Sequence, residues 1–174
     1  KILWIDSDRL GFMINTVTKE ALEAEKQVVK NEKRERVDNA PYGYTDEIIR
    51  SNLYPDNHPY HWTVIGSLPD LQAATLDDVK EFYDQYYGAN NATLVIAGDI
   101  NLAEAKEKVQ RWFGEIRKGP EVKPLGPMPA RLDQTKSLYF EDNFARLPEL
   151  RMVFPTVENY HQDTYALTML GELL

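Results

Sequence analysis

The distribution of apolar and polar residues predicts helices over most of the first two thirds of the chain. From Lys19 to about Arg36 the sequence is rich in Ala, Glu, Lys, Gln and Val and contains neither Gly nor Pro. This composition predicts a long helix with Thr16 or Thr18 as its N-cap. Pro41-Tyr42-Gly43 interrupts the pattern, and a shorter helix is expected from about Thr45 to Leu53.

Three further helices are predicted downstream. Thr75-Leu76-Asp77-Asp78 begins one that reaches about Tyr87, with acidic residues in its first turn, where they suit the helix dipole. Leu102–Phe113 has the apolar spacing of an amphipathic helix, and Asp99 is expected to cap it. A last helix is expected from Asp163 onward.

Short apolar runs between these helices predict strands. Asn91–Ala97 is nearly continuous in apolar residues, as in a strand covered on both faces, and Gly98-Asp99 ends it. Ser137–Glu141 and Leu150–Phe154 are two further candidates. Helices combined with these strands predict a layered α/β or α+β fold.

A proline-rich stretch divides the chain. Residues 119–129 contain four prolines and two glycines, a density that neither a helix nor a central strand tolerates. We interpret 119–130 as an interdomain linker between residues 1–118 and 131–174. The alternative is a long loop within one domain, in which the later strands pair with Asn91–Ala97.

Composition narrows the class of protein. The 174 residues are 43% hydrophobic, enough for one ordinary core or for one domain plus part of another, and no apolar run is long enough to cross a bilayer. Lys and Arg number 20 against 28 Asp and Glu, and this net charge of −8 argues against a nucleic-acid or anionic-membrane partner. The absence of cysteine excludes disulfides and thiolate metal sites. Because the chain lacks an initiator Met, a leader and a C-terminal stop signal, we expect it to be a piece of a longer protein.

The long helix carries two glutamates among its apolar positions. Leu22, Val29 and Arg36 follow one another at seven-residue intervals, and Glu25 and Glu32 lie between them on the same face. A helix that buries this face also buries carboxylates, which is costly unless they meet a cation or a metal. The structural alternative is that Glu32 pairs with Arg36 and that the face lies at a solvent boundary.

Geometry limits what these glutamates do together. Seven residues advance a helix by about 10.5 Å, whereas carboxylate oxygens bind zinc at roughly 2.0–2.2 Å. One glutamate could therefore be a metal ligand and the other a supporting group, and the pattern does not decide which. His58 and His61 flank Pro59-Tyr60 in a predicted loop, so we interpret them as loop residues rather than a metal pair.

The two glutamates belong to an ordered series of short motifs that covers nearly the whole chain. Around the run from Glu25 to Glu32 the series comprises Ser7–Phe12, Glu32-Lys33-Arg34, Val37-Asp38-Asn39, Tyr54-Pro55, His58-Pro59-Tyr60, Ile65-Gly66-Ser67, Tyr86-Tyr87-Gly88, Asn91-Ala92 and Leu94–Asp99. This series resembles the insulinase (pitrilysin) family of zinc metallopeptidases, bacterial members above all. The run from Glu25 to Glu32 is similar to the family's second metal motif, in which a ligand glutamate follows another glutamate by seven residues.

This resemblance implies that Glu32 is a zinc ligand and that Glu25 supports it. The family's other ligands and its general base belong to a His-x-x-Glu-His motif, which this sequence lacks and which is expected before Lys1. The implied fold is α+β, with the mixed helix and antiparallel-sheet layers of the mitochondrial-processing-peptidase type. Residues 1–118 would close the zinc-binding domain, and 131–174 would open a second, non-catalytic homologous domain.

The resemblance implies a zinc-dependent endopeptidase that cleaves peptides or small proteins in a two-domain chamber, with this piece alone inactive. The alternative is a non-catalytic family subunit that binds peptides or completes the chamber of an active partner. Retention of both Glu25 and Glu32 favours the enzyme. The resemblance also allows a homodimer or heterodimer with a family member, without nucleic acid or membrane insertion. It favours an extracytoplasmic location, periplasmic or secreted, with the cytoplasm as the alternative.

Overall fold

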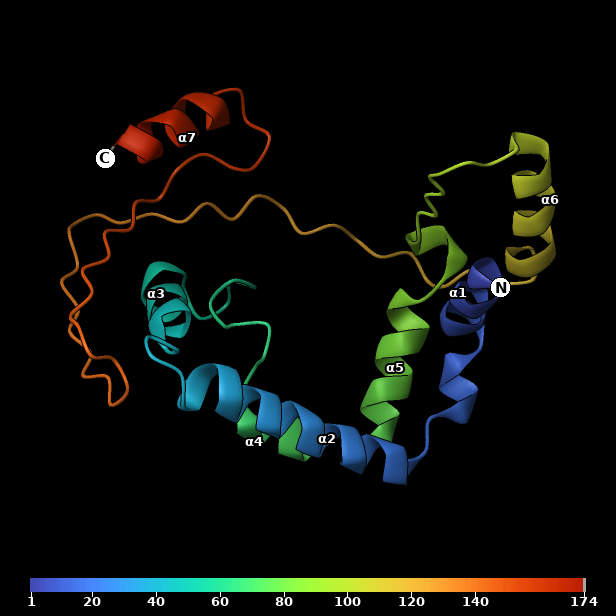
Figure 1. The fold of residues 1–174 in the computed structure, drawn as a ribbon, viewed down its shortest axis with the longest axis horizontal. Coiled ribbons are helices and arrows are strands. Elements are labelled where there is room, and N and C mark those ends of the chain that lie inside the picture. Colours follow the sequence, from blue (N-terminus) through green and yellow to red (C-terminus); the bar gives the residue numbers. More distant parts are fainter. Residues whose placement is uncertain (174) are drawn as a thin grey trace. The chain divides into compact units, whose positions relative to one another are not determined.

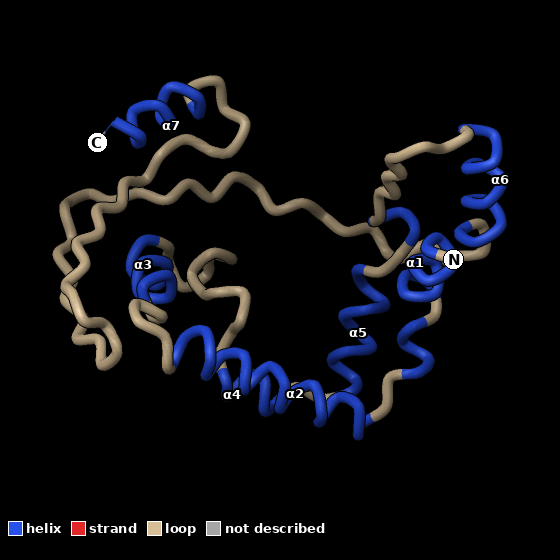
Figure 2. The backbone as a smooth tube through the Cα atoms, viewed as in Figure 1, coloured by secondary structure: helices blue, strands red, loops and turns tan. Residues whose placement is uncertain are grey.

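The computed structural model describes residues 1–173, and every regular element within them is helical (Figures 1 and 2). A 3-10 turn at Met13–Thr16 and another at Ala89–Asn91 supplement the α-helices, and a π-helical turn at Arg34–Asp38 directly follows α2. The α-helices are α1 (Ile2–Gly11), α2 (Lys19–Lys33), α3 (Thr45–Leu53), α4 (Leu68–Ala73), α5 (Leu76–Tyr86), α6 (Leu102–Phe113) and α7 (Thr164–Leu173).

The five predicted helices are confirmed. Helices α3 and α6 have the predicted ends, and α5 and α7 agree to within a residue or two. Helix α2 reaches Lys33 and continues as the π-helical turn, so the helical backbone extends slightly beyond the predicted Arg36. Helices α1 and α4 were not predicted.

Side-chain caps explain several helix starts. The Thr18 hydroxyl accepts the Ala21 N–H at 3.2 Å, which selects Thr18 over Thr16 as the cap of α2. Thr75 and Asp78 form a reciprocal capping box at α5, and the hydrogen bonds from Thr75 lower the pKa of Asp78. The predicted cap of α6 is wrong, because Asn101 rather than Asp99 accepts the N–H groups of Ala103 and Glu104 at the start of that helix.

The predicted α+β fold is not what the structure shows. Asn91–Ala97, Ser137–Glu141 and Leu150–Phe154 form no strand, and residues 1–173 contain no sheet. Ala92 has an extended backbone (φ −120°, ψ 142°), but extended conformation alone does not make a strand. A strand requires a neighbouring chain segment to exchange backbone hydrogen bonds, and none of these runs has one within the described residues.

The chain divides into two compact units, of which unit 1 comprises Lys1–Gln27 and Pro69–Leu125. Its buried apolar side chains are Tyr83 on α5 and Ile116 just after α6. The Tyr83 hydroxyl donates to the carbonyl of Leu10 at 2.5 Å, which joins α5 to the end of α1, and burial raises the pKa of Tyr83. Helix α6 also packs on α1. Unit 1 therefore has a small core with one polar tie at its centre.

Unit 2 comprises Val28–Leu68 and the chain from Gly126 onward. The turn before α3 is tight, because a Cβ atom at Gly43 would overlap the carbonyl of Val37 and Tyr42 has a left-handed backbone (φ 59°). Asp142 holds this turn: its carboxylate accepts N–H groups from Tyr42, Phe144 and Ala145 at 2.9, 2.7 and 2.6 Å. A single carboxylate thus organises two turns that are a hundred residues apart.

The predicted linker contains no regular element. Residues 119–130 run as an irregular chain between α6 and α7 (Figure 1), as their proline content predicts. The domain assignment of residues 1–118 and 131–174 stays a prediction, and its last residue, Leu174, lies outside the described residues.

The hydrogen bonds of Asp142 predict that the stability of unit 2 falls at acidic pH. Hydrogen bonds from Phe144, Ala145 and Tyr42 lower the pKa of Asp142 in the folded chain. A group whose pKa is lower when folded stabilises the fold above its unfolded pKa of about 3.9, and this stabilisation is lost as the pH falls through the folded pKa. Asp142→Asn should lower the urea midpoint at pH 7 and reduce its fall between pH 7 and pH 3.

Asp133→Asn is the matched control, because it removes the same charge from the same segment at an exposed residue. Its urea midpoint should follow that of the unaltered chain at both pH values. An Asp142→Asn variant that also follows it would show that the three hydrogen bonds do not contribute measurably to the stability of unit 2.

Candidate functional site

The most buried side chains of α2 and its continuation are lysines. Lys26 is 3% exposed and Lys33 is 8% exposed, whereas Leu22 and Val29 are only half-buried. The two lysines are seven residues apart, and each directly follows one of the two candidate glutamates. A buried ammonium needs partners, so the contacts of these lysines determine which side of the helix faces outward.

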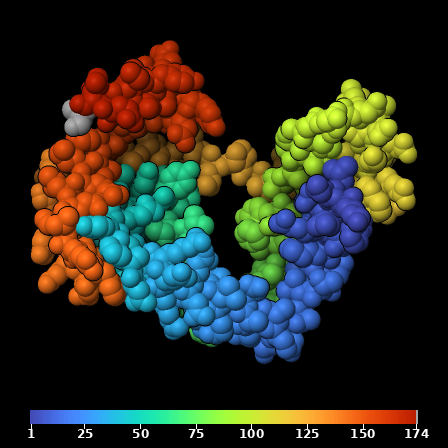
Figure 3. Space-filling view, viewed as in Figure 1, coloured from blue at the N-terminus to red at the C-terminus, as the bar shows by residue number. Residues whose placement is uncertain are grey.

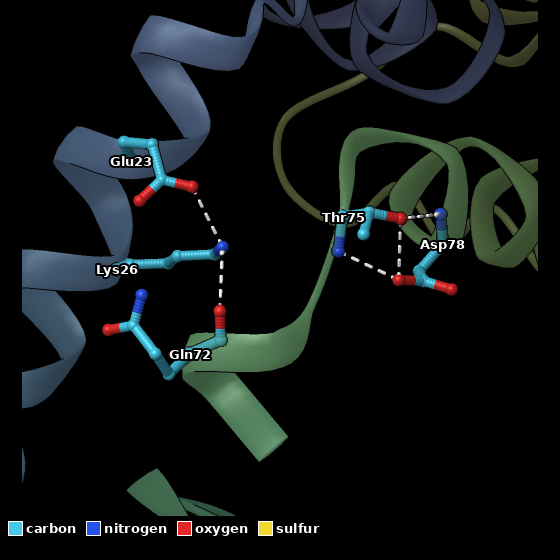
Figure 4. A network of polar contacts seen from close by, with 5 residues as sticks. All are labelled: Glu23, Lys26, Gln72, Thr75 and Asp78. Atoms are coloured by element: carbon cyan, nitrogen blue, oxygen red, sulfur yellow. Dashed lines mark hydrogen bonds and ion pairs between the residues drawn. The ribbon is translucent and has the colours of Figure 1, made fainter. Parts of the chain in front are cut away.

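Lys26 is held within unit 1 by two oxygen atoms (Figure 4). Its Nζ atom donates to the Glu23 carboxylate at 2.8 Å and to the Gln72 carbonyl at 3.3 Å. Gln72 belongs to α4, so this lysine ties α2 to the helix that precedes the Thr75 capping box. Glu25, one residue before Lys26, is exposed.

Glu32 lies at the surface of unit 2 with its side chain 39% exposed. Its Oε1 atom is 3.0 Å from Nη1 of Arg36, one helical turn later. This is the ion pair that the structural alternative predicts. The Oε2 atom of Glu32 has no hydrogen-bond or ion-pair partner among residues 1–173. The carboxylate thus keeps one free oxygen and faces solvent.

The chemistry of Glu32 suits one position of a zinc site. Carboxylate oxygen is an ordinary zinc ligand, and the Glu32 side chain is partly exposed. Within the described part of the chain, however, no three His, Asp or Glu side chains are grouped so that they could hold a metal ion. The remaining donors of a four-coordinate site would have to come from elsewhere, and the metal roles of Glu32 and Glu25 stay predictions.

The ring nitrogens of the two loop histidines form hydrogen bonds with backbone groups. His58 is buried, accepts the Tyr60 N–H at Nδ1 (2.9 Å) and contacts the Met128 carbonyl through Nε2 (2.8 Å). These partners require the tautomer with the proton on Nε2. Nδ1 of His61 lies 2.8 Å from the Tyr54 carbonyl. Both histidines therefore have the structural role that the sequence favours.

A groove of about 510 Å³ lies within unit 2, between α3 and the irregular segment 132–153. Figure 3 shows this segment (orange) against α3 (cyan). Its floor is mainly apolar, with Ile48 and Leu53 from α3 and Phe140 from the segment, and Arg146 is among the charged residues that line it. Two hydrogen bonds join residues that line it: Lys136 donates to the Asn52 carbonyl (2.6 Å) and the Tyr42 hydroxyl donates to the Leu147 carbonyl (2.7 Å).

Sequence comparison decides the family. The family described as "Peptidase M16 inactive domain" matches residues 73–174, more than half of the chain. The chain belongs to the M16 peptidase family. This is the insulinase family that the motif series resembles, so the motif-based identification is confirmed. The family's relatives are hydrolases named as proteases and peptidases.

Three curated relatives differ in how similar they are to this chain and in how much of each the chain covers. The zinc protease PqqE of Helicobacter pylori is 32% identical over 154 residues, which cover 86% of this chain and 34% of that protein. The peroxisomal insulin-degrading enzyme-like 1 of Arabidopsis thaliana is 28% identical over 76% of the chain and 14% of its own length. The mitochondrial-processing peptidase subunit beta of Caenorhabditis elegans is 24% identical over 87% of the chain and 33% of its own length.

A solved structure agrees with this membership. The crystal structure of a protease from Helicobacter pylori matches with a TM-score of 0.66 and 30% identity, over 75% of this chain and 31% of that one. The chain thus spans about a third of the two Helicobacter pylori proteins and a smaller part of the Arabidopsis relative. In the part that the structure describes, no helix is long and apolar enough to cross a membrane.

Sequence reasoning missed the two buried lysines. Their signal was present, because Lys26 and Lys33 repeat at seven residues one position after Glu25 and Glu32. Lysine is rarely buried, so the pattern alone favours a solvated face, and only tertiary partners make the lysines the inward side.

The His58 contacts predict how the 119–130 segment is held. Replacing His58 by Ala removes the side chain that binds the Met128 carbonyl, so this end of the segment should become more accessible. We expect faster cleavage near Met128 in limited proteolysis. His161→Ala is the control, because it also removes an imidazole but lies just before α7 and not at the Met128 carbonyl. Equal cleavage rates for both variants and the unaltered chain would show that His58 does not restrain the segment.

Proposed function

We propose that this chain supplies a glutamate ligand to the active site of a zinc-dependent endopeptidase, as one part of a longer M16 protein. The observation that supports it is the surface position of Glu32 on α2, with one carboxylate oxygen free, in a chain that is 32% identical to a zinc protease. Within this proposal Glu32 binds the metal directly, and Glu25 supports the site from an earlier turn of the same helix.

The chain's own part in the chemistry is to hold a carboxylate in place. Zinc, when bound, would activate a water molecule for attack on a peptide carbonyl. Glu32 would contribute negative charge and one oxygen donor, and its short tie to Arg36 would limit its side-chain freedom. The histidines and the general base would come from outside this chain, because no three His, Asp or Glu side chains within residues 1–173 are grouped so that they could hold a metal ion.

The proposal extends to the architecture of the whole protein. Residues 119–130 would join the zinc-binding domain to a second domain, and together these would enclose an extended peptide or a small protein. Four prolines within 119–129 would keep this tether semi-extended. The relatives named as a beta subunit of a peptidase support assembly with another family member as a homodimer or heterodimer. We also propose an extracytoplasmic location.

A second candidate function rests on the groove of unit 2. Its apolar floor and the charged residues along it suit a peptide side chain and backbone, and the family description that matches 73–174 is that of an inactive domain. The parent protein would then be a non-catalytic subunit that binds peptides for an active partner. Zinc content of the purified full-length protein separates the two candidates, since only the first requires stoichiometric metal.

Substitution of the two glutamates tests the zinc role. In the full-length protein, Glu32→Gln should lose more zinc affinity than Glu25→Gln, because glutamine keeps the shape but removes the charged ligand. Loss of a supporting partner typically costs about 10–100-fold in affinity, and loss of a ligand should exceed this. Metal content and zinc affinity of both variants are the measurement.

Glu35→Gln is the matched control, because Glu35 is exposed and lies on the turn that follows Glu32. It should bind zinc as the unaltered protein does. If Glu32→Gln also keeps full zinc, Glu32 is a structural residue and the proposal is wrong.

The chain of 174 residues alone should neither bind zinc tightly nor cleave peptides. One carboxylate ligand does not make a tetrahedral site, and the described residues offer no set of three donors. Titration calorimetry with zinc and a quenched-peptide assay are the measurements. Tight stoichiometric binding, or cleavage that a chelator stops, would contradict the assignment and would direct attention back to His58 and His61.

A further inference from the structure

Lys33 is the last residue of α2 and carries a buried ammonium group next to the proposed zinc ligand. Its side chain is only 10% exposed, although it directly follows Glu32, whose side chain is 39% exposed. Taking a lysine out of water is unfavourable unless anionic or π-electron partners surround it. The position of Lys33 is therefore determined by its partners rather than by its own preference.

Three partners surround the ammonium, all within unit 2. The Lys33 Nζ atom lies 3.5 Å from Oδ1 of Asp38 and 3.8 Å from Oε2 of Glu47, and it sits 5.4 Å from the centre of the Tyr44 ring. The Tyr44 hydroxyl donates to the same Asp38 oxygen at 2.8 Å, which raises the pKa of Tyr44. Asp38 closes the π-helical turn, and Glu47 lies on α3.

This cluster fixes the rotation of the last turn of α2. Successive residues of a helix are separated by about 100° around its axis. If Lys33 points to Asp38 and Glu47, then Glu32 must point about 100° away from them, toward the surface. The turn cannot relax easily at its other end, because the Val37 carbonyl packs directly against Gly43.

We propose that Lys33 is a positioning residue for Glu32: by anchoring its ammonium between Asp38, Glu47 and the Tyr44 ring, it sets the direction in which the Glu32 carboxylate points. This inference rests on the proposed zinc role of Glu32. Lys33 itself does not contact the metal. It acts through the orientation of the helix, and its effect on zinc should vanish when Glu32 is no longer a ligand.

Electrostatics and positioning predict opposite effects when Lys33 is replaced. Removing a positive charge near a cation favours zinc binding, if charge alone matters. Loss of the anchor leaves Glu32 free to rotate and weakens binding. Lys33→Met keeps the length of the side chain and removes its charge, so the sign of the change in zinc affinity separates the two effects.

The experiment measures zinc affinity by chelator competition in full-length protein, together with the melting temperature of the metal-free form. Lys33→Met should lower zinc affinity about 10-fold or more, the usual scale for loss of a group that orients a ligand. Lys33→Arg should retain most of the affinity, because it keeps the charge. Arg34→Met is the control, since it removes one positive charge from the exposed next residue and should not weaken binding.

A double substitution tests whether Lys33 acts through Glu32. In a Glu32→Gln background, Lys33→Met should cause no further loss of zinc affinity, because coupled residues are not additive. Equal losses in both backgrounds, or a Lys33→Met variant that keeps full affinity while Glu32→Gln loses it, would overturn the inference but leave the proposed function intact. Full zinc in Glu32→Gln would instead overturn the proposed function.

A partner variant covers the case in which Lys33→Met does not fold. Glu47 is 47% exposed on α3, so Glu47→Gln removes one anchor of the ammonium at small structural cost. It should lower zinc affinity when Glu32 is present and leave it unchanged in Glu32→Gln. An unchanged affinity in both backgrounds would overturn the inference.

Discussion

The cost of burying an ammonium group controls how α2 is placed in this protein. An apolar face packs without directional preference, so a helix held by Leu22 and Val29 alone could rotate by several degrees at little cost. Lys26 is held by two hydrogen bonds, whose geometry depends on direction. Lys33 lies between the carboxylates of Asp38 and Glu47, at 3.5 and 3.8 Å, and this ion-pair cluster fixes where its charge lies. The surface positions of Glu25 and Glu32 follow from these anchors, each within its own unit.

Local information explains why the helices were predictable and why their faces were not. Thr18, the Thr75–Asp78 box and the apolar spacing of Leu102–Phe113 act over four residues or fewer, so the sequence itself contains them. Which face of α2 is buried depends instead on tertiary partners. Gln72 contacts Lys26 from a helix 46 residues later, and Glu47 contacts Lys33 from the helix after the next turn. A seven-residue repeat identifies a face of a helix but does not indicate which neighbour covers it.

The strand predictions failed for a related reason. The apolar run at Leu94 and Val95 has strand-like composition, yet these side chains are 41% and 79% exposed. Strand formation needs both an extended backbone and a partner at hydrogen-bonding distance, and composition predicts only the first. In the same way Leu150 and Phe154 are mostly exposed. An apolar run therefore identifies a candidate strand but not the segment that pairs with it.

The Glu32–Arg36 ion pair fits the structural interpretation of the helix, but it does not oppose the zinc proposal. Arg36 is 75% exposed and Glu32 is 39% exposed, so the pair is a surface salt bridge. Such pairs contribute about 0–1 kcal/mol, whereas zinc bound by a complete structural site contributes about 10–16 kcal/mol. Even a quarter of the latter exceeds the former. A zinc ion completed by three further donors would therefore take the Glu32 carboxylate from Arg36, which is free to turn toward solvent.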